Sequence, residues 1–269
     1  MTRARASVVG PALVVGAGTV ALLCALVSIA VWSADGQIAD ERAMRTVTIG
    51  REAELTVLSV LGRVPMWTVV VVAVVGLLLA VRRHDARAAL GAGVVVLGAN
   101  ATTQLTKHSL LERSDFGLGV HNSLPSGHVT LVVSAVAALL IVAPPAARAV
   151  VAGLGAFAAG LTGLSTIVAG WHRPADVVAA LLVVMAWCAV GVVIHGGRRG
   201  RGTRGTLTLA LGGALASLVA IVLIGVRPVD GRMDGFLDAG LVLGTVALAS
   251  AIAMWVMAWL CPRGTVRQP

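Results

Sequence analysis

The chain has 269 residues, of which 58% are hydrophobic and only 12% are charged, and its mean hydropathy is +0.94. These values exclude an ordinary soluble domain, in which about a quarter of the residues are charged. We therefore expect an all-α fold, a polytopic transmembrane helical bundle. The formal net charge of +9 and the pI of 11.4 are better explained by membrane topology than by a nucleic-acid partner, which we do not expect.

Eight stretches are apolar and long enough, at about 20 residues, to cross about 30 Å of hydrocarbon. They are residues 9–32, 64–81, 87–106, 127–143, 149–170, 174–195, 206–226 and 238–260. The first is longer than the apolar core of a signal peptide, roughly 7–15 residues, so we expect a retained span. The second is the least regular, because Arg63 and Pro65 interrupt the approach to it. Small residues recur in the fifth, which predicts close helix packing there.

Positive charge is distributed unevenly between the two sets of alternating loops. One set holds twelve arginines and one acidic residue, whereas the other holds nine basic and eleven acidic residues. Cytoplasmic loops are enriched in Lys and Arg, so both termini are expected on the cytoplasmic side of the cell membrane. The most basic loop, residues 196–205, divides an expected six-span domain (1–195) from two further spans and a short tail (206–269).

Three cysteines, Cys24, Cys188 and Cys261, lie far apart in the sequence without the spacing of a metal site, and we expect them in the core. Three polar clusters, in contrast, interrupt the apolar sequence between residues 105 and 176. All three fall on the predicted extracytoplasmic side. Ionisable groups near a membrane interior are costly, so groups that gather there usually face one another or a water-filled site.

His172 and Asp176 form the last cluster, four residues apart at the start of a predicted helix. This spacing places both side chains on one face, and Pro174 suits the first helical turn. A carboxylate that accepts a hydrogen bond from one imidazole nitrogen leaves the other free as a nucleophile or base. A helix-capping interaction at the membrane interface explains the pair equally well when it is considered alone.

The middle cluster is Pro125-Ser126-Gly127-His128, directly before an apolar run. Ser126 can cap the following helix, Gly127 permits close backbone approach, and the free N–H groups at the helix start favour a phosphate. His128 would then be placed to give a proton to a departing oxygen. The alternative is an ordinary junction between a loop and a helix.

Lys107 and Arg113 form the first cluster, where the third span ends. Either residue alone is more typical of an interface anchor. Together with the polar side chains at the same helix end, they form a wall with two cations that suits a phosphate. Those polar side chains are Asn100, Thr103 and Gln104.

The order of these clusters resembles the motifs of the type-2 phosphatidic acid phosphatase superfamily of membrane lipid phosphatases. The resemblance covers the six spans up to His195. It implies that His172 attacks phosphorus to form a phosphohistidine, that Asp176 orients His172, and that His128 protonates the leaving alcohol. The residues that it implies in phosphate binding are Lys107, Arg113, Ser126 and Gly127. It implies no metal or other cofactor.

The chain departs from the superfamily's pattern at two places. Five residues, rather than six, separate Lys107 from Arg113, and Ser114 follows where the pattern has proline. Thr166 stands six residues before His172, where the pattern has an arginine that binds phosphate. Cations stabilise the charge of a phosphoryl transition state, so an unreplaced loss would slow the reaction greatly. The candidates to replace this arginine are Arg173, His108 and His121.

The sequence thus predicts a membrane phosphatase that hydrolyses a lipid phosphate monoester or pyrophosphate at the extracytoplasmic face. Phosphatidic acid, phosphatidylglycerol phosphate and isoprenoid phosphates all fit, and membrane lipids surround the spans. Two other functions stay open. Thr166 favours a catalytically impaired relative that binds lipid phosphates or serves membrane assembly. A transporter coupled to protons or metal is also possible, although carriers place polar groups near mid-membrane. The loop 33–54 either covers the site or only connects two spans.

Overall fold

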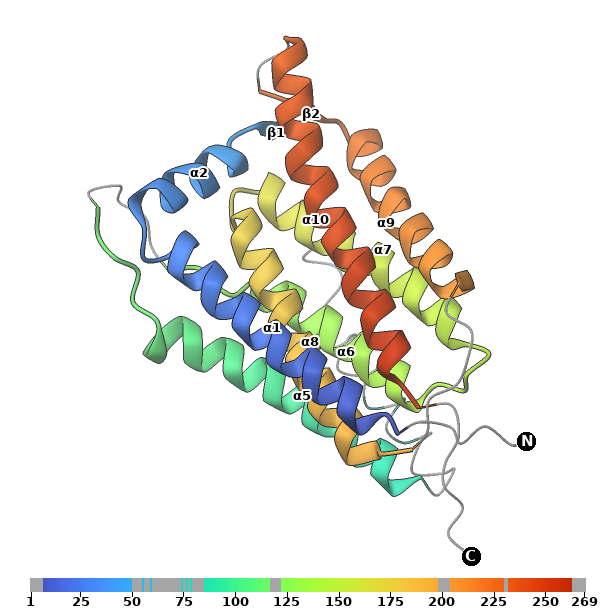
Figure 1. The fold of residues 1–269 in the computed structure, drawn as a ribbon. Coiled ribbons are helices and arrows are strands. Elements are labelled where there is room, and N and C mark those ends of the chain that lie inside the picture. The colour runs from blue at the N-terminus through green and yellow to red at the C-terminus, as the bar shows by residue number, and fades with distance from the viewer. Residues whose placement is uncertain are drawn as a thin grey trace, which may run out of the picture.

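The computed structural model describes residues 7–49, 85–116, 122–197, 204–229 and 232–262, together with Leu55, Ser59, Val74, Gly76 and Leu78. Long helices run side by side and make up most of it (Figure 1). The helices are α1 (Val9–Ala30), α2 (Ala34–Met44), α5 (Ala86–Leu105), α6 (Gly127–Val142), α7 (Arg148–Val168), α8 (Pro174–His195), α9 (Arg204–Ile224) and α10 (Met233–Leu260). A short π-helix, η1 (Thr106–Leu110), continues α5.

Within the described residues, six helices have the length and hydropathy of membrane spans, namely α1, α5 with η1, α7, α8, α9 and α10. The apolar helix α6 is shorter, with 16 residues. The predicted all-α polytopic bundle is therefore confirmed, and these helices overlap seven of the eight predicted spans. The second predicted span, residues 64–81, lies outside the described residues except at Val74, Gly76 and Leu78.

Small residues bring the helices into close contact. A Cβ atom on Gly91 of α5 would lie 2.5 Å from the carbonyl oxygen of Gly191 in α8, and one on Gly213 of α9 would lie 2.0 Å from that of Gly153 in α7. Only glycine permits such an approach, because any side chain would collide with the facing backbone. The small-residue run of α7 thus sets the distance to α9.

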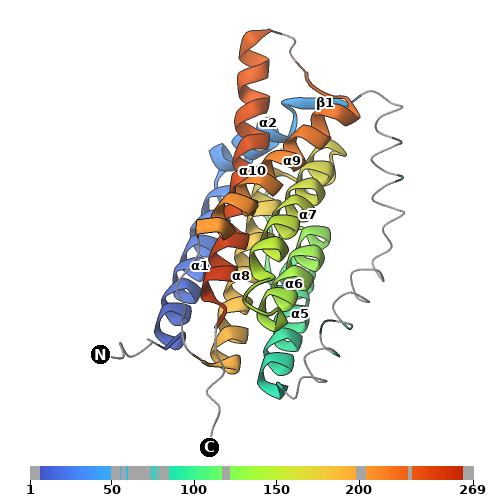
Figure 2. The same cartoon turned by 90° about the vertical axis from the view of Figure 1, so that its right-hand side faces the viewer.

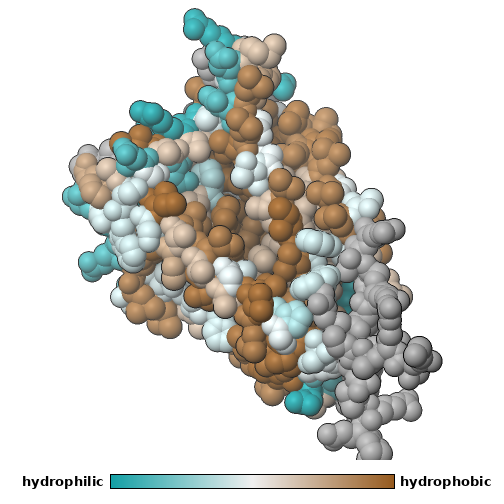
Figure 3. All heavy atoms as spheres, in the orientation of Figure 1, coloured by the Kyte–Doolittle hydropathy of each residue, from teal (hydrophilic) through white to brown (hydrophobic). Residues whose placement is uncertain are grey.

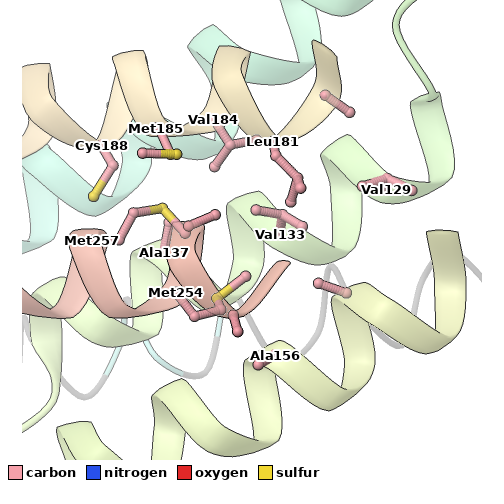
Figure 4. Packing of buried hydrophobic residues seen from close by; sticks show 14 of the residues in the cluster. Val129, Val133, Ala137, Ala156, Leu181, Val184, Met185, Cys188, Met254 and Met257 are labelled. Atoms are coloured by element: carbon pink, nitrogen blue, oxygen red, sulfur yellow. The ribbon is translucent and has the colours of Figure 1, made fainter. Parts of the chain in front are cut away.

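The apolar core lies where α6, α7, α8 and α10 meet, as Figure 4 shows. Its labelled residues include Val133 and Ala137 of α6, Leu181 and Cys188 of α8, and Met254 and Met257 of α10. Cys188 and Cys261 are buried, as predicted, but Cys24 is exposed on α1, so its predicted core position is wrong. Because α9 packs along α7 and α10 packs against α6, α7 and α8, the last two helices belong to the same bundle.

One end of the bundle, which we call the α2 end, gathers α2 and the starts of α6, α8 and α10 (Figure 2). Hydrophilic side chains collect towards this end, and apolar side chains cover the middle of the face shown in Figure 3. The strands β1 (Val47–Ile49) and β2 (Val226–Pro228) pair antiparallel there. The start of α1 and the end of α10 lie at the opposite end (Figure 1). The α2 end therefore corresponds to the predicted extracytoplasmic side.

The segment predicted as the loop 33–54 contains both α2 and β1. α2 begins after Ser33, whose Oγ accepts a hydrogen bond from the N–H of Gly36 at 3.1 Å. This side-chain cap satisfies one of the free N–H groups of the first turn. β1 then joins the segment to β2, between α9 and α10. Residues 34–49 of this segment are thus folded and tied to the C-terminal helices.

Candidate active site

His172 and Asp176 are in contact at the α2 end. α7 ends at Val168, and the N–H groups of Trp171 and His172 donate to the carbonyl oxygen of Thr166, which fixes the turn into α8. Nδ1 of His172 lies 3.2 Å from Oδ2 of Asp176, and the two side chains are 6% and 0% exposed. The carboxylate accepts, so Nδ1 carries the proton and Nε2 keeps its lone pair. No described residue hydrogen-bonds to Nε2.

Oδ2 of Asp176 accepts two further hydrogen bonds. The N–H of Arg173 donates to it at 3.0 Å, and Oγ of Ser123 lies 2.6 Å away. Ser123 in turn accepts from Nη1 of Arg173 at 3.0 Å, while Nε of Arg173 donates to Glu41 of α2 at 2.8 Å. The predicted pair thus sits inside a larger network. Sequence reasoning did not find Ser123 or Glu41, because neither belongs to a motif.

Ser126 occupies the N-cap position of α6, but its side chain makes no capping bond, so the prediction that it caps this helix is wrong. Its Oγ is buried without a partner among the described residues. Its N–H instead donates to the backbone oxygen of Asp176 at 3.0 Å, and its carbonyl oxygen accepts from Oγ1 of Thr130. The Pro-Ser-Gly-His segment is therefore joined directly to the start of α8.

His128 is half-buried in the first turn of α6. Its ring packs against Trp171, with the ring centroids 5.7 Å apart and an angle of 35° between the planes. Trp171 directly precedes His172 in the turn between α7 and α8, so His128 of α6 lies close to that turn. Gly127 faces the end of α5, since a Cβ on it would lie 3.8 Å from Nε2 of Gln104.

Lys107 lies half-buried on η1 and makes no hydrogen bond or ion pair with the described part of the chain. Two residues of the predicted polar wall instead join α5 to α6. Nδ2 of Asn100 donates to Ser134 at 3.0 Å, and the hydroxyls of Thr103 and Thr130 lie 2.9 Å apart.

Arg113 lies beside this network as a cation with unused donors. Its Nη1 donates to the carbonyl oxygen of Ala30 at 3.0 Å, whereas Nε and Nη2 are buried and have no partner among the described residues. Burial and then the nearby charge of Arg173 lower the pKa of Arg113, and the carboxylates of Asp176 and Asp40 act against this shift. Buried donors without partners are costly, so they indicate a place for an acceptor.

Two adjacent carboxylates of α2 reach the start of α8. Oδ1 of Asp40 accepts from the N–H of Ala175 at 3.0 Å, and burial raises the pKa of Asp40 to about 6. Burial opposes ionisation of Glu41 as well, but hydrogen bonds from Arg173 and Arg45 outweigh it and lower the pKa of Glu41. α2 thus contacts the segment that carries His172 and Asp176, rather than only connecting two spans.

Thr166, which replaces the arginine of the motif, is fully buried, and its Oγ1 donates to the carbonyl oxygen of Gly163 within its own helix. Of the proposed substitutes, Arg173 is 9% exposed within the network, and His108 is exposed on η1. His121 lies outside the described residues. No group of three or more His, Cys, Asp or Glu side chains within the described ranges could hold a metal ion.

The fold and the site define an integral-membrane protein of the phosphatase-like kind, with a His-Asp pair, a second histidine and cations at one end of a helical bundle. Residues 94–199 match the family model described as PAP2 superfamily. The matched region contains all three polar clusters, so the resemblance drawn from them is confirmed. Neither the comparison with curated proteins nor that with solved structures gave a match.

Proposed function

We propose that the protein is a lipid phosphatase that hydrolyses a phosphate monoester or pyrophosphate of a membrane lipid through a phosphohistidine. One observation carries the proposal: the buried His172–Asp176 pair, with Nδ1 held at 3.2 Å from the carboxylate and Nε2 unpartnered among the described residues. An imidazole held in this way is the arrangement that nucleophilic catalysis needs.

Nε2 of His172 attacks phosphorus and the bond to the leaving oxygen breaks. Asp176 holds the Nδ1 proton and stabilises the positive charge that forms on the ring. His128 gives its proton to the leaving oxygen, which departs as an alcohol or a phosphate. A water molecule then attacks the phosphohistidine while His128 takes its proton, which releases phosphate and restores both histidines.

Unused donors and cations support a phosphate site beside His172. Nε and Nη2 of Arg113 and Oγ of Ser126 are buried without partners among the described residues, so phosphate oxygens would satisfy them. Lys107 adds a point charge, and the N–H groups at Gly127 lie at the start of α6. Arg173 supplies a further charge in place of the motif arginine that Thr166 lacks.

The lipid tail would stay in the bilayer while the headgroup enters the α2 end. The charge difference between the loops favours an extracytoplasmic site and cytoplasmic termini in the cell membrane. The six-span domain (1–195) would then carry the chemistry, with the loop 196–205 and the two further spans (206–269) attached to it. Residues 198–203 of that loop lie outside the described residues.

Thr166 supports a second candidate, a catalytically impaired relative that binds lipid phosphates or serves membrane assembly. Its buried hydroxyl donates within α7, so it supplies no charge to the site. Losing one phosphate cation of the motif is the kind of change that removes catalysis and leaves binding.

The test is phosphate release in detergent with EDTA present, from phosphatidic acid, phosphatidylglycerol phosphate, and isoprenoid phosphate and pyrophosphate. The parent protein is compared with His172→Ala. His195→Ala is the matched control, because His195 belongs to a second His-Asp pair at the other end of α8. Its Nε2 lies 3.5 Å from Oδ2 of Asp85. We expect release by the parent and the control only. No release by folded parent protein, together with binding of a lipid phosphate, would favour the impaired relative.

A further inference from the structure

We propose that Ser123 is a positioning residue for the His172–Asp176 pair, and that α2 holds Ser123 in place through Glu41 and Arg173. This inference rests on the proposed function. It extends the site beyond the matched region, since Glu41 lies outside residues 94–199.

The direction of the hydrogen bonds gives Ser123 its role. Arg173 can only donate, so Oγ of Ser123 must accept the bond from Nη1, at 3.0 Å. The hydroxyl proton of Ser123 is then left for Oδ2 of Asp176, at 2.6 Å. A carboxylate fixed by this donor and by the N–H of Arg173 cannot turn away from Nδ1 of His172. Ser123 thus acts on the imidazole through Asp176.

Arg173 needs a second anchor if it is to orient Ser123, and α2 provides it. Nε of Arg173 donates to Glu41 at 2.8 Å, and the two side chains are 10% and 19% exposed. Such a pair is shielded from solvent and salt far better than a surface pair. Nη2 of Arg45, the residue that directly follows α2, lies 2.8 Å from Oε1 of Glu41 and forms an ion pair with it.

The adjacent residue and the following strand keep α2 in register with α8. Asp40 accepts from the N–H of Ala175, so two consecutive side chains of α2 bind the start of α8. β1 then pairs with β2, which anchors the segment to the α9–α10 connection. The C-terminal helices thereby support the same hydrogen-bond network, which gives them a part in the site.

Steady-state kinetics of phosphate release test the role of Ser123. We expect Ser123→Ala to lower kcat roughly tenfold or more, the effect of losing a hydrogen bond to a charged group, with KM little changed. Ser123→Thr keeps the hydroxyl and should retain most of kcat. Glu41→Ala should lower kcat less than Ser123→Ala does. The double variant should have a kcat close to that of Ser123→Ala, because both substitutions interrupt one network. Asp35→Asn removes an exposed charge from the same helix and is the matched control.

A second measurement does not depend on activity. In 15N spectra of histidine-labelled protein in micelles, the His172 signal, assigned by its loss in His172→Ala, should show one tautomer with the proton on Nδ1. Ser123→Ala should show a mixture of both tautomers. If the parent releases phosphate and Ser123→Ala keeps both kcat and the single tautomer, this inference is wrong and the proposed function stands. If the parent releases no phosphate, the proposed function is wrong, and the tautomer still decides whether Ser123 orients His172.

Discussion

Buried polar atoms at the α2 end divide into those that hold one another and those without a partner among the described residues. Oδ2 of Asp176 belongs to the first group, with three contacts. The second group includes Nε and Nη2 of Arg113 and Oγ of Ser126. A buried polar atom left unpaired costs about 1–3 kcal/mol, so these atoms lower the free energy of unfolding. Binding of an anion that accepts from them would recover part of that free energy.

The contacts of this network differ in how far they could be predicted from the sequence. Asp176 lies in the first turn of α8 and His172 lies two residues before that helix, so their short separation in the sequence brings them together. Ser123 lies 53 residues from Asp176, and Glu41 lies 132 residues from Arg173. Such contacts depend on how helices and loops pack, which a single sequence without a motif does not indicate.

Asp40 makes the stability of the protein depend on pH. Burial raises its pKa from 3.8 to about 6, so the folded protein binds this proton more tightly than the unfolded chain. The contribution of Asp40 to the free energy of unfolding therefore falls as the pH rises from about 4 to about 6 and stays lower above that range, by up to about 3 kcal/mol. Asp40→Asn keeps the acceptor for Ala175 and should remove this contribution.

The measurement is thermal unfolding in detergent micelles between pH 4 and 7.5. Asp35→Asn, at an exposed position on the same helix, should follow the parent profile. Parallel profiles for the parent and Asp40→Asn would show that the Asp40 carboxyl does not cause the pH dependence.

The helices and strands differ in how strongly their own sequences predict them. Each span is a long apolar run, so hydropathy located seven of them. α2 has charged and polar side chains and depends on contacts with α8, while β1 and β2 have three residues each and depend on one another. Elements stabilised mainly by tertiary contacts leave a weak local signal, which is why the sequence indicates residues 33–54 only as a loop that covers the site or connects two spans.

The close approach of α7 and α9 can be tested by substituting glycines of α9. A Cβ at Gly213 would lie 2.0 Å from the carbonyl oxygen of Gly153, whereas one at Gly212 meets nothing within 4 Å. We expect Gly213→Ala to destabilise the protein by about 1–3 kcal/mol, because the helices must separate. Gly212→Ala should be neutral or slightly stabilising, since alanine favours the helix. Thermal unfolding in micelles compares the two, and equal effects would contradict the close approach.

At the scale of the whole molecule, the bundle joins the matched region to segments outside it. α10 packs against α6, α7 and α8, and β2 holds the segment that carries α2. Hydropathy predicts α9 and α10 as spans but does not predict which helices they contact, because an apolar helix surface fits any neighbour of similar shape. The site residues come from α6, η1 and the start of α8, while α2 contacts the start of α8 and is joined to the C-terminal helices through β1 and β2.

The distribution of charge predicts which way this bundle faces. The loops predicted on the extracytoplasmic side carry a slight acidic excess and the other loops are strongly basic, so we expect the α2 end to lie outside the cell. Cys188 and Cys261 are buried, so Cys24→Ser alone leaves a background with little accessible thiol. Asp35→Cys and Ala146→Cys then place one exposed thiol at each end.

A membrane-impermeant maleimide should label Asp35→Cys in intact cells, and should label Ala146→Cys only after the membrane is permeabilised. The two positions lie at opposite ends of the bundle, so we expect opposite results whichever way it faces. The reverse pattern would place the site at the cytoplasmic face, where it would act on lipids of the inner leaflet. Labelling of both thiols in intact cells would mean that α2 and the α6–α7 turn do not lie on opposite sides of the membrane.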